Sequence, residues 1–289
     1  MSDEIRLRAY AKVNFGLNVL PKREDGFHNI ESIFQTVDLS DELIVSKQNK
    51  KICSVHCSSL LLPLENTLTL AFKAFTEVTG FCDFGINVEL IKGIPSGGGL
   101  GGGSSDAATL IRCMEKFYGI RLSDEQLSLV ASKVGSDVFF FTRCNGNGMG
   151  CALVSGRGEV VEPFTGRKDL YIVLVFPKAS SSTKLAYSLI DESYTNGKII
   201  KGPSLDQLKS VYRKYPSEWN FVNTFTPVVS ETYPEISQAL KDVRKSGALF
   251  SDVSGSGSTV YGVFLDEQQA VYSNNLLAGN WYSSLVKTL

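Results

Sequence analysis

A run of glycines between a strand-like segment and a helix-like segment limits most strongly the folds open to this chain. Six of the seven residues 97–103 are glycine. Glycine adopts positive φ at no steric cost and lets another molecule approach the backbone, but ordering many glycines costs conformational entropy. A flexible linker or a bound ligand would each explain such a run. The flanking sequence decides between these explanations.

The flanks of the run are patterned as regular secondary structure. Residues 84–91 alternate apolar and polar side chains, as in a half-buried strand. Downstream, Ser104-Ser105-Asp106 opens a helical pattern that stops at Gly119. A glycine loop between a strand and a helix N-terminus favours an anion, because free N–H groups and the helix dipole point towards it. The sequence therefore predicts a phosphate-binding loop.

Known kinds of phosphate loop differ in the residues that follow the glycines. A Walker A loop carries a lysine after its last glycine, whereas Gly103 is followed by Ser104. A dinucleotide-binding loop has G-x-G-x-x-G and an acidic residue about 20 positions later. The glycines at 97, 99 and 102 meet that spacing with Asp124. A run this rich in glycine satisfies almost any glycine pattern, so the match is weak.

A third pattern fits Pro95, Gly99-Leu100-Gly101 and Ser104-Ser105. The loop resembles the phosphate loop of the GHMP kinase superfamily, which includes galactokinase and the homoserine, mevalonate and phosphomevalonate kinases. The resemblance implies that backbone N–H groups bind the phosphates of ATP and that Ser105 faces the magnesium-bound phosphates. The residues expected to contact ATP are Pro95, Gly97, Gly98, Gly99, Leu100, Gly101, Gly102, Gly103, Ser104 and Ser105.

A second motif, Ala11-Lys12-Val13-Asn14, lies in a predicted strand over residues 6–20. Its lysine and amide share one face of that strand and, taken alone, would face solvent. The motif is followed by Arg23-Glu24-Asp25-Gly26-Phe27-His28 and then by Ser32-Ile33-Phe34-Gln35. Together these segments resemble the 4-diphosphocytidyl-2-C-methylerythritol kinases, a GHMP subfamily of the non-mevalonate isoprenoid pathway. Other GHMP kinases lack the D-G-[YF]-H element.

Two further motifs occur in the order of that subfamily. Val134-Gly135-Ser136-Asp137-Val138 resembles its I-G-[AS]-D-[VI]-P segment. Taken alone, an aspartate just past a helix is a solvated cap. Residues 252–260, around a Ser-Gly-Ser-Gly turn, resemble the C-terminal GHMP motif. The resemblance therefore spans nearly the whole chain.

Some positions depart from the family pattern. Phe27 stands where tyrosine is common, which keeps the ring and loses a hydroxyl. Asp106 replaces a frequent asparagine and places an extra negative charge near the phosphates. Phe139 follows Asp137-Val138 where proline is usual, and residues 178–184 lack a proline-flanked threonine.

The family resemblance implies ATP- and Mg²⁺-dependent phosphorylation of the 2-hydroxyl of 4-(cytidine 5'-diphospho)-2-C-methyl-D-erythritol. It makes Asp137 the carboxylate that takes the proton of the acceptor hydroxyl, with Lys12 beside it. The residues that it implies for the substrate are Asn14 at the acceptor diol, Phe27 and His28 at the cytosine, and Thr183 and Tyr187 on a later segment. The alternatives are a homoserine- or mevalonate-type kinase and a GHMP-fold binding protein without catalysis.

Composition excludes several other classes of function. The net charge is −1 and no basic tract indicates nucleic acid binding. No apolar run is long enough to cross a membrane, and the first residues lack the pattern of a signal or transit peptide. Cys53, His56 and Cys57 lack a second ligand pair, and scattered cysteines are typical of reduced thiols. We expect a cytoplasmic enzyme, a monomer or weak homodimer, with no protein-enclosed metal site.

The predicted elements favour α+β architecture, because strands and helices come in blocks without strict alternation. Strands are expected at 6–20, 32–39, 41–46, 84–91, 152–161, 170–176, 247–253 and 258–265. Helices are expected from 104 and at 67–79, 124–134, 183–194, 205–215 and 234–246. The resemblance implies the two-domain GHMP kinase fold. We expect an N-terminal domain over 1–163 with the phosphate loop, Lys12 and Asp137, a C-terminal domain over 164–289, and an active-site cleft between them.

Overall fold

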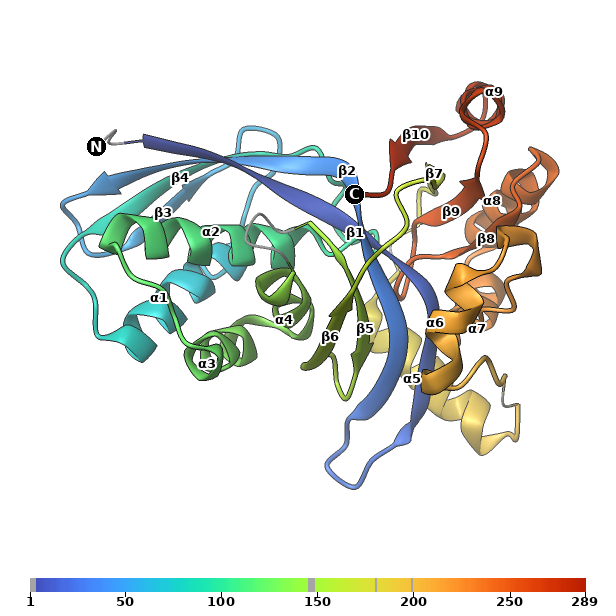
Figure 1. Cartoon of the computed structure of the whole chain (residues 1–289), viewed down its shortest axis with the longest axis horizontal. Helices are drawn as coiled ribbons and strands as arrows, with labels where there is room; N and C mark the ends of the chain where they lie inside the picture. The colour runs from blue at the N-terminus through green and yellow to red at the C-terminus, as the bar shows by residue number, and fades with distance from the viewer. Residues whose placement is uncertain (1–3, 145–148, 180, 199) are drawn as a thin grey trace.

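Two long strands form an antiparallel hairpin through the middle of the molecule (Figure 1). The computed structural model describes residues 4–144, 149–179, 181–198 and 200–289. Strand β1 spans Glu4–Lys22 and strand β2 spans His28–Gln48. The separate strands expected at 32–39 and 41–46 are therefore one strand. The alternation of apolar and polar residues changes near residue 40 because the neighbouring strand changes there. Residues 32–35 pair with β5, and residues 42–48 pair with β4.

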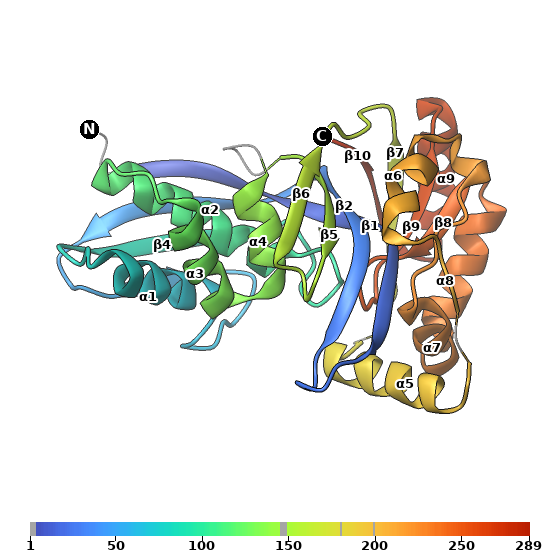
Figure 2. The ribbon, with the colours of Figure 1, turned by 60° about the horizontal axis from the view of Figure 1, so that its bottom comes forward.

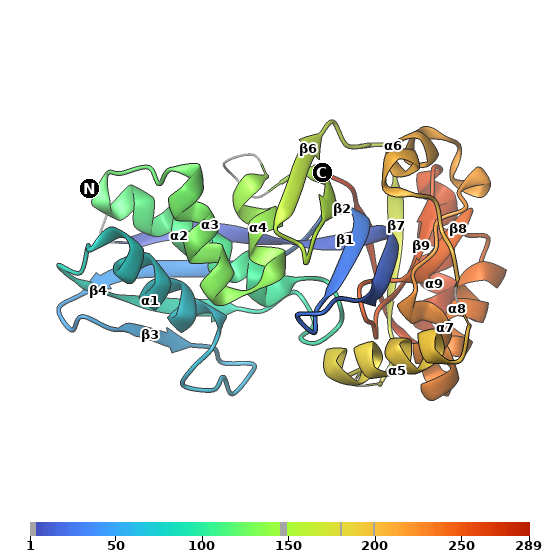
Figure 3. The same ribbon diagram turned by 90° about the horizontal axis from the view of Figure 1, so that it is seen from below.

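The first sheet has the strand order β3-β4-β2-β5-β6, with β1 paired to β2. Helices α1 to α4 cover one face of it (Figures 1 and 3). The single strand expected at 152–161 is wrong: it is a hairpin, because Gly156 and Gly158 turn the chain with positive φ. The further strands and helices of this part are β3 (Cys53–His56), β4 (Gly85–Ile91), β5 (Cys151–Ser155), β6 (Val160–Phe164), α1 (Thr67–Thr79), α2 (Gly102–Tyr118), α3 (Asp124–Val134) and α4 (Ser136–Arg143).

The second sheet has the antiparallel order β10-β7-β9-β8. Helix α5 lies against the tip of the long hairpin, below the rest of the second half (Figure 2). The sequence predicts neither α7, α9 nor β10. The elements of this part are β7 (Tyr171–Phe176), α5 (Thr183–Thr195), α6 (Leu205–Arg213), a 3-10 turn at Pro216–Glu218, α7 (Phe225–Thr232), α8 (Pro234–Lys245), β8 (Phe250–Val253), β9 (Val260–Phe264), α9 (Glu267–Ala278) and β10 (Tyr282–Lys287).

The long hairpin contributes to two hydrophobic cores. Ala11, Val13 and Phe15 are fully buried and pack in a core with side chains of the second sheet, such as Ile172 and Tyr261. Other side chains of the hairpin, such as Phe34, belong to a larger core that contains α1 to α4 and also side chains of the second half. The two-residue period of β1 is therefore confirmed, and it turns Lys12 and Asn14 away from the second sheet. The boundary between the two expected domains, at 163/164, stays a prediction.

Capping residues fix the bounds of several helices. Helices α1 and α3 have the predicted bounds, and capping boxes at Asn66 and Ser123 begin them. Gly119 ends α2 in the left-handed conformation, as predicted. Within the described ranges, no helix combines the length and the apolar character needed to cross a bilayer.

Candidate active site

The glycine loop connects β4 to α2 and presents the free N-terminus of that helix. Gly97, Gly99 and Gly101 have positive φ. Helix α2 begins at Gly102, two residues before the predicted start, and no side chain caps its first N–H groups. Such an uncapped, dipole-positive terminus favours an anion. Every residue predicted to contact ATP lines a cavity of about 340 Å³ here, except Ser105, which is buried in α2.

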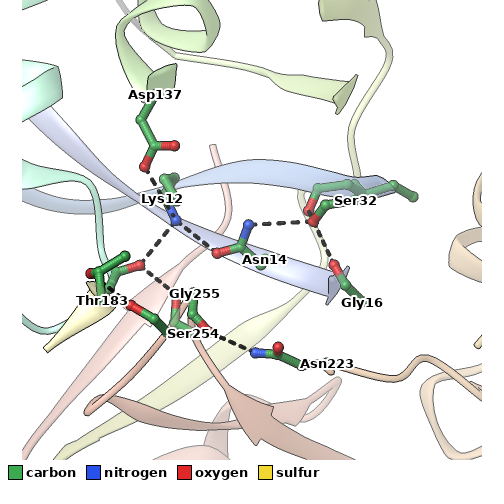
Figure 4. A network of polar contacts seen from close by, with 12 residues as sticks. Lys12, Asn14, Gly16, Ser32, Asp137, Thr183, Asn223, Ser254 and Gly255 are labelled. Atoms are coloured by element: carbon green, nitrogen blue, oxygen red, sulfur yellow. Dashed lines mark hydrogen bonds and ion pairs between the residues drawn. The ribbon is translucent and has the colours of Figure 1, made fainter. Parts of the chain in front are cut away.

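Three motifs that are distant in sequence meet at the carbonyl of Gly99, and Figure 4 shows the Lys12 and Ser254 side chains that contact it. Lys12 Nζ and Ser254 Oγ both donate hydrogen bonds to this oxygen, each at 3.0 Å. Backbone bonds run beside it, from Lys12 N to Leu100 O at 2.9 Å and from the N–H of Thr259 to the carbonyl of Gly98 at 3.2 Å. The opening strand and the C-terminal turn therefore hold the loop from two sides.

Lys12 is the central charge of the site and is 3% exposed. Its ammonium donates to Asn14 Oδ1 at 2.7 Å and lies 3.6 Å from Asp137 Oδ2. Burial lowers the pKa of Lys12, and the Asp137 carboxylate acts in the opposite direction. With Gly99 O, these contacts give the ammonium three oxygen neighbours in a poorly hydrated place, where its charge acts strongly on nearby groups.

Asp137 lies in the first turn of α4, a helix that the sequence did not predict. The sequence predicted an aspartate just past the second helix, outside any helix, and this is corrected. Gly135, in an extended conformation, is both the last cap of α3 and the first cap of α4, so Asp137 lies inside a helix. The positive end of α4 favours a carboxylate at this position. The side chain of Asp137 remains 32% exposed, so it faces both Lys12 and the open part of the site.

Asn14 is buried, and its amide is already engaged by the protein. Its Oδ1 accepts from Lys12, and its Nδ2 donates to Ser32 Oγ at 3.3 Å. Ser32 in turn donates to the carbonyl of Gly16. This chain of bonds fixes the amide, so Asn14 orients the Lys12 ammonium. Its predicted contact with an acceptor diol stays a prediction.

A second cavity of about 650 Å³ lies between the tip of the β1–β2 hairpin, the α3–α4 junction and α5. It brings together the predicted residues Phe27, His28 and Tyr187. The rings of His28 and Tyr187 are 5.2 Å apart and tilted by 30°. Gly135 and Ser136 also line it, so the cavity reaches the start of α4, next to Asp137.

Thr183 lies apart from the other predicted substrate residues. Its Oγ1 is 3.0 Å from Ser256 Oγ, on the C-terminal turn. Ser181 Oγ donates to the carbonyl of Ser256 at 2.8 Å. The start of α5 is thereby joined to the turn that backs the glycine loop, and Thr183 does not line the cavity around Tyr187.

Comparison with known proteins identifies the family. A family model described as GHMP kinases N terminal domain matches residues 66–145, and one described as GHMP kinases C terminal matches residues 204–275. The 4-diphosphocytidyl-2-C-methyl-D-erythritol kinase of Treponema pallidum (strain Nichols) is 37% identical over 286 residues, 96% of each chain. The Thermotoga maritima protein of the same name is 39% identical over 272 residues, 91% of this chain and 93% of its own. The chain belongs to this kinase family.

Solved structures agree with this kinase family. A crystal structure of 4-(cytidine 5'-diphospho)-2C-methyl-D-erythritol kinase superposes with a TM-score of 0.76 at 26% identity, over 98% of this chain and 99% of that one. A homoserine kinase from Cytophaga hutchinsonii superposes with a TM-score of 0.69 at 20% identity, which supports the fold alone. The predicted GHMP kinase fold is confirmed, and the chain is an ATP-dependent kinase.

Sequence reasoning missed several residues of this kinase site. Asn223 is buried, and its Nδ2 donates to the carbonyls of Val253 and Gly255 at 2.8 Å each, which secures the C-terminal turn (Figure 4). The Cζ atom of Arg157 lies 4.7 Å from the centre of the Phe27 ring, and the Asp191 carboxylate contacts His28 Nε2. Asn223 has no local signal. Asp191 follows Tyr187 by one helical turn, a spacing that places both on one face of α5.

Proposed function

We propose that the chain transfers the γ-phosphate of ATP to the 2-hydroxyl of 4-(cytidine 5'-diphospho)-2-C-methyl-D-erythritol. The observation that carries this proposal is the place of the Lys12–Asp137 pair between two cavities. Lys12 contacts the glycine loop at Gly99, and Asp137 adjoins the cavity lined by Phe27 and His28. One cavity suits phosphates, and the other suits an aromatic base. The names of the full-length relatives agree with this substrate and not with homoserine or mevalonate.

Phosphoryl transfer depends on positioning and on stabilisation of charge more than on covalent chemistry. The N–H groups of the glycine loop and of the α2 N-terminus would hold the ATP phosphates. Asp137 would accept the proton of the acceptor hydroxyl. The buried Lys12 ammonium would stabilise the negative charge that develops on that oxygen, since a preorganised charge in a dry site acts strongly.

The cytidine diphosphate part of the substrate would serve as a handle. Phe27 and Tyr187 offer aromatic surface for the base, and His28 offers a polar ring beside them. Binding energy from this remote part would hold the reacting hydroxyl at Asp137. We assign Asn14 to the acceptor diol and Thr183 to substrate binding near the C-terminal turn.

Mg²⁺ fits this site as an ion held mainly by the nucleotide. The described ranges contain no cluster of three His, Cys, Asp or Glu side chains that would enclose a metal ion. Mg²⁺ typically binds one or two carboxylates together with substrate phosphates and water. The ATP phosphates would hold the ion beside the glycine loop, where it would neutralise charge, and Asp137 would stay free to accept the proton. We also propose the domain division at 163/164, a cytoplasmic location and a monomer or weak homodimer.

Replacing Asp137 by Asn tests the chemistry. The change keeps the shape of the side chain and removes its ability to take a proton, so kcat should fall by about 10² to 10⁴. ATP affinity should stay within a few-fold of the wild type, as measured by calorimetry. Turnover near that of the wild type would rule out the role of Asp137 as proton acceptor.

A comparison of acceptors tests the substrate. ADP release should depend on 4-(cytidine 5'-diphospho)-2-C-methyl-D-erythritol and should be absent with homoserine or mevalonate. Activity with one of the latter two alone would contradict the proposed substrate and leave the assignment of Lys12 and Asp137 intact.

A further inference from the structure

Asp191 of α5 joins this helix to both arms of the β1–β2 hairpin. One carboxylate oxygen, Oδ2, lies 3.1 Å from Lys22 Nζ, just before the hairpin tip. The other, Oδ1, lies 3.2 Å from His28 Nε2, just after the tip. All three residues line the cavity that holds Phe27 and Tyr187. A single side chain therefore spans the gap between the two walls of this cavity.

The contact of Asp191 with His28 depends on a proton. His28 Nδ1 lies 2.8 Å from the carbonyl of Leu20, which only accepts hydrogen bonds, so Nδ1 carries a hydrogen. The Asp191 carboxylate also only accepts. The Nε2 contact is therefore attractive when His28 carries both protons and repulsive when Nε2 presents its lone pair.

Charged groups from several elements line the cavity around His28. The ring is 8% exposed, and the ring of Tyr187 covers it at 5.2 Å. The ionisable groups that line the same cavity are Lys22 of β1, Lys184, Tyr187 and Asp191 of α5, and Arg157 and Glu159 of the β5–β6 turn. Asp191 is the one carboxylate among them that contacts the imidazole. It is therefore the acidic group that ties the imidazole to α5.

We propose that Asp191 is a positioning residue for the cytidine part of the substrate: it clamps Lys22 and His28 to α5 and so sets the spacing between the hairpin tip, which carries Phe27, and Tyr187 on α5. Tyr187 lies one helical turn before Asp191, so the clamp and the aromatic wall move as one body. Without the clamp, the hairpin tip and α5 separate and the base loses one of its walls. The glycine loop and the Lys12–Asp137 pair lie outside the clamp, so ATP binding and the chemical step are preserved. This inference rests on the proposed function.

The test is calorimetric titration of the protein with CDP, in the wild type and in three variants. Asp191→Ala should weaken CDP binding about tenfold, the value of one hydrogen bond to a charged group. In turnover with the full substrate, its KM should rise by the same factor while kcat and the KM for ATP stay unchanged. Glu192→Ala, the next residue of α5 and exposed to solvent, is the matched control and should bind CDP like the wild type.

Asp191→Asn separates a positioning role from a merely structural one. An amide donates to a neutral imidazole and accepts from a protonated one, so its contact survives a change of charge on His28. At one fixed pH, the Asn variant should therefore bind CDP more tightly than Asp191→Ala and approach the affinity of the wild type. Equal losses in Asp191→Asn and Asp191→Ala would contradict a clamp made by these polar contacts.

The outcomes separate the two proposals. A wild type that does not bind CDP overturns the proposed function and this inference with it. A wild type that binds CDP, with Asp191→Ala equal to it, overturns the role of Asp191 alone.

Discussion

A half-buried ammonium shared by two buried carboxylates anchors the glycine loop at both ends. Lys92 Nζ contacts Asp41 and lies 3.3 Å from Asp106 Oδ2, in the first part of α2. Asp41 Oδ1 accepts from the N–H groups of Gly93 and Ile94, at 2.7 and 2.8 Å, where the chain leaves β4. One positive charge faces two buried carboxylates here. Burial, and then the charge of Asp41, raise the pKa of Asp106 to about 8.

Asp106→Asn should therefore change the pH dependence of stability. Because the folded state holds the Asp106 proton more tightly than the unfolded state, the stabilisation is complete below about pH 4 and is lost as pH rises towards 8. Asparagine has no such proton. The free energy of unfolding of the variant should therefore rise relative to that of the wild type, by at most about 1.4 kcal/mol per pH unit across this range. Urea unfolding at several pH values measures the difference. A constant difference would show that Asp106 is ionised throughout.

The glycine loop and the C-terminal turn act as one element, although 155 residues separate their hydrogen-bonded groups. Gly99 has a φ of 77°, and a Cβ added there would lie 2.0 Å from the carbonyl oxygen of Ser254. Gly97 has a φ of 72°, and a Cβ there would meet nothing within 4 Å. The two glycines thus share a backbone conformation and differ only in what they contact.

Gly99→Ala should weaken ATP binding at least tenfold, because the added methyl group forces the loop and the turn apart. Gly97→Ala is the control: it carries the same left-handed strain, about 1 to 2 kcal/mol, without the collision. Calorimetry with ATP and thermal unfolding compare the two variants. Equal losses in both would mean that strain, and not contact with Ser254, explains the role of Gly99.

The elements that the sequence predicted carry their own signals. Capping boxes at Asn66 and Ser123 are local, so the bounds of α1 and α3 follow from neighbouring residues. Helices such as α4 and α7 are eight residues long and lack side-chain caps, so their stability comes from tertiary packing that no short window reveals. Strand β2 was expected as two strands because its neighbour changes from β5 to β4 along its length, which alters the pattern of apolar and polar residues.

The residues of the site likewise fall into those that the sequence predicted and those that it did not. Lys12, Asp137 and the glycines stand within short motifs, so a family resemblance found them. The hydrogen bonds of Asn223 and the contact of Asp191 with His28 join segments far apart in the chain, and their residue types are ordinary on the surface or in loops. Only the fold brings such residues to a site.

At the scale of the molecule, the long hairpin belongs to both halves. Phe15 of β1 packs in the core shared with the second sheet, whereas Phe34 of β2 packs against Phe140 of α4, with ring centroids 5.3 Å apart. Removing either half would expose one face of β1 and β2. The structure therefore favours one cooperative unit over two independent domains.

Unfolding should accordingly show one transition. Trp219 reports on the second core by fluorescence, in a Trp281→Phe background that leaves it as the single tryptophan. The reactivity of the buried Cys113 thiol reports on the first core. Both probes should give the same urea midpoint within error. Two separate midpoints would show that the halves unfold independently.

The bond between Ser254 and the Gly99 carbonyl also has a consequence for how the protein is made. Lys12 and Gly99 leave the ribosome well before Ser254, so the growing chain has a glycine loop that nothing supports from behind. The loop gains its second support only when most of the polypeptide has been synthesised. A chain that has not yet reached Ser254 therefore lacks the assembled site, however early its glycine loop is made.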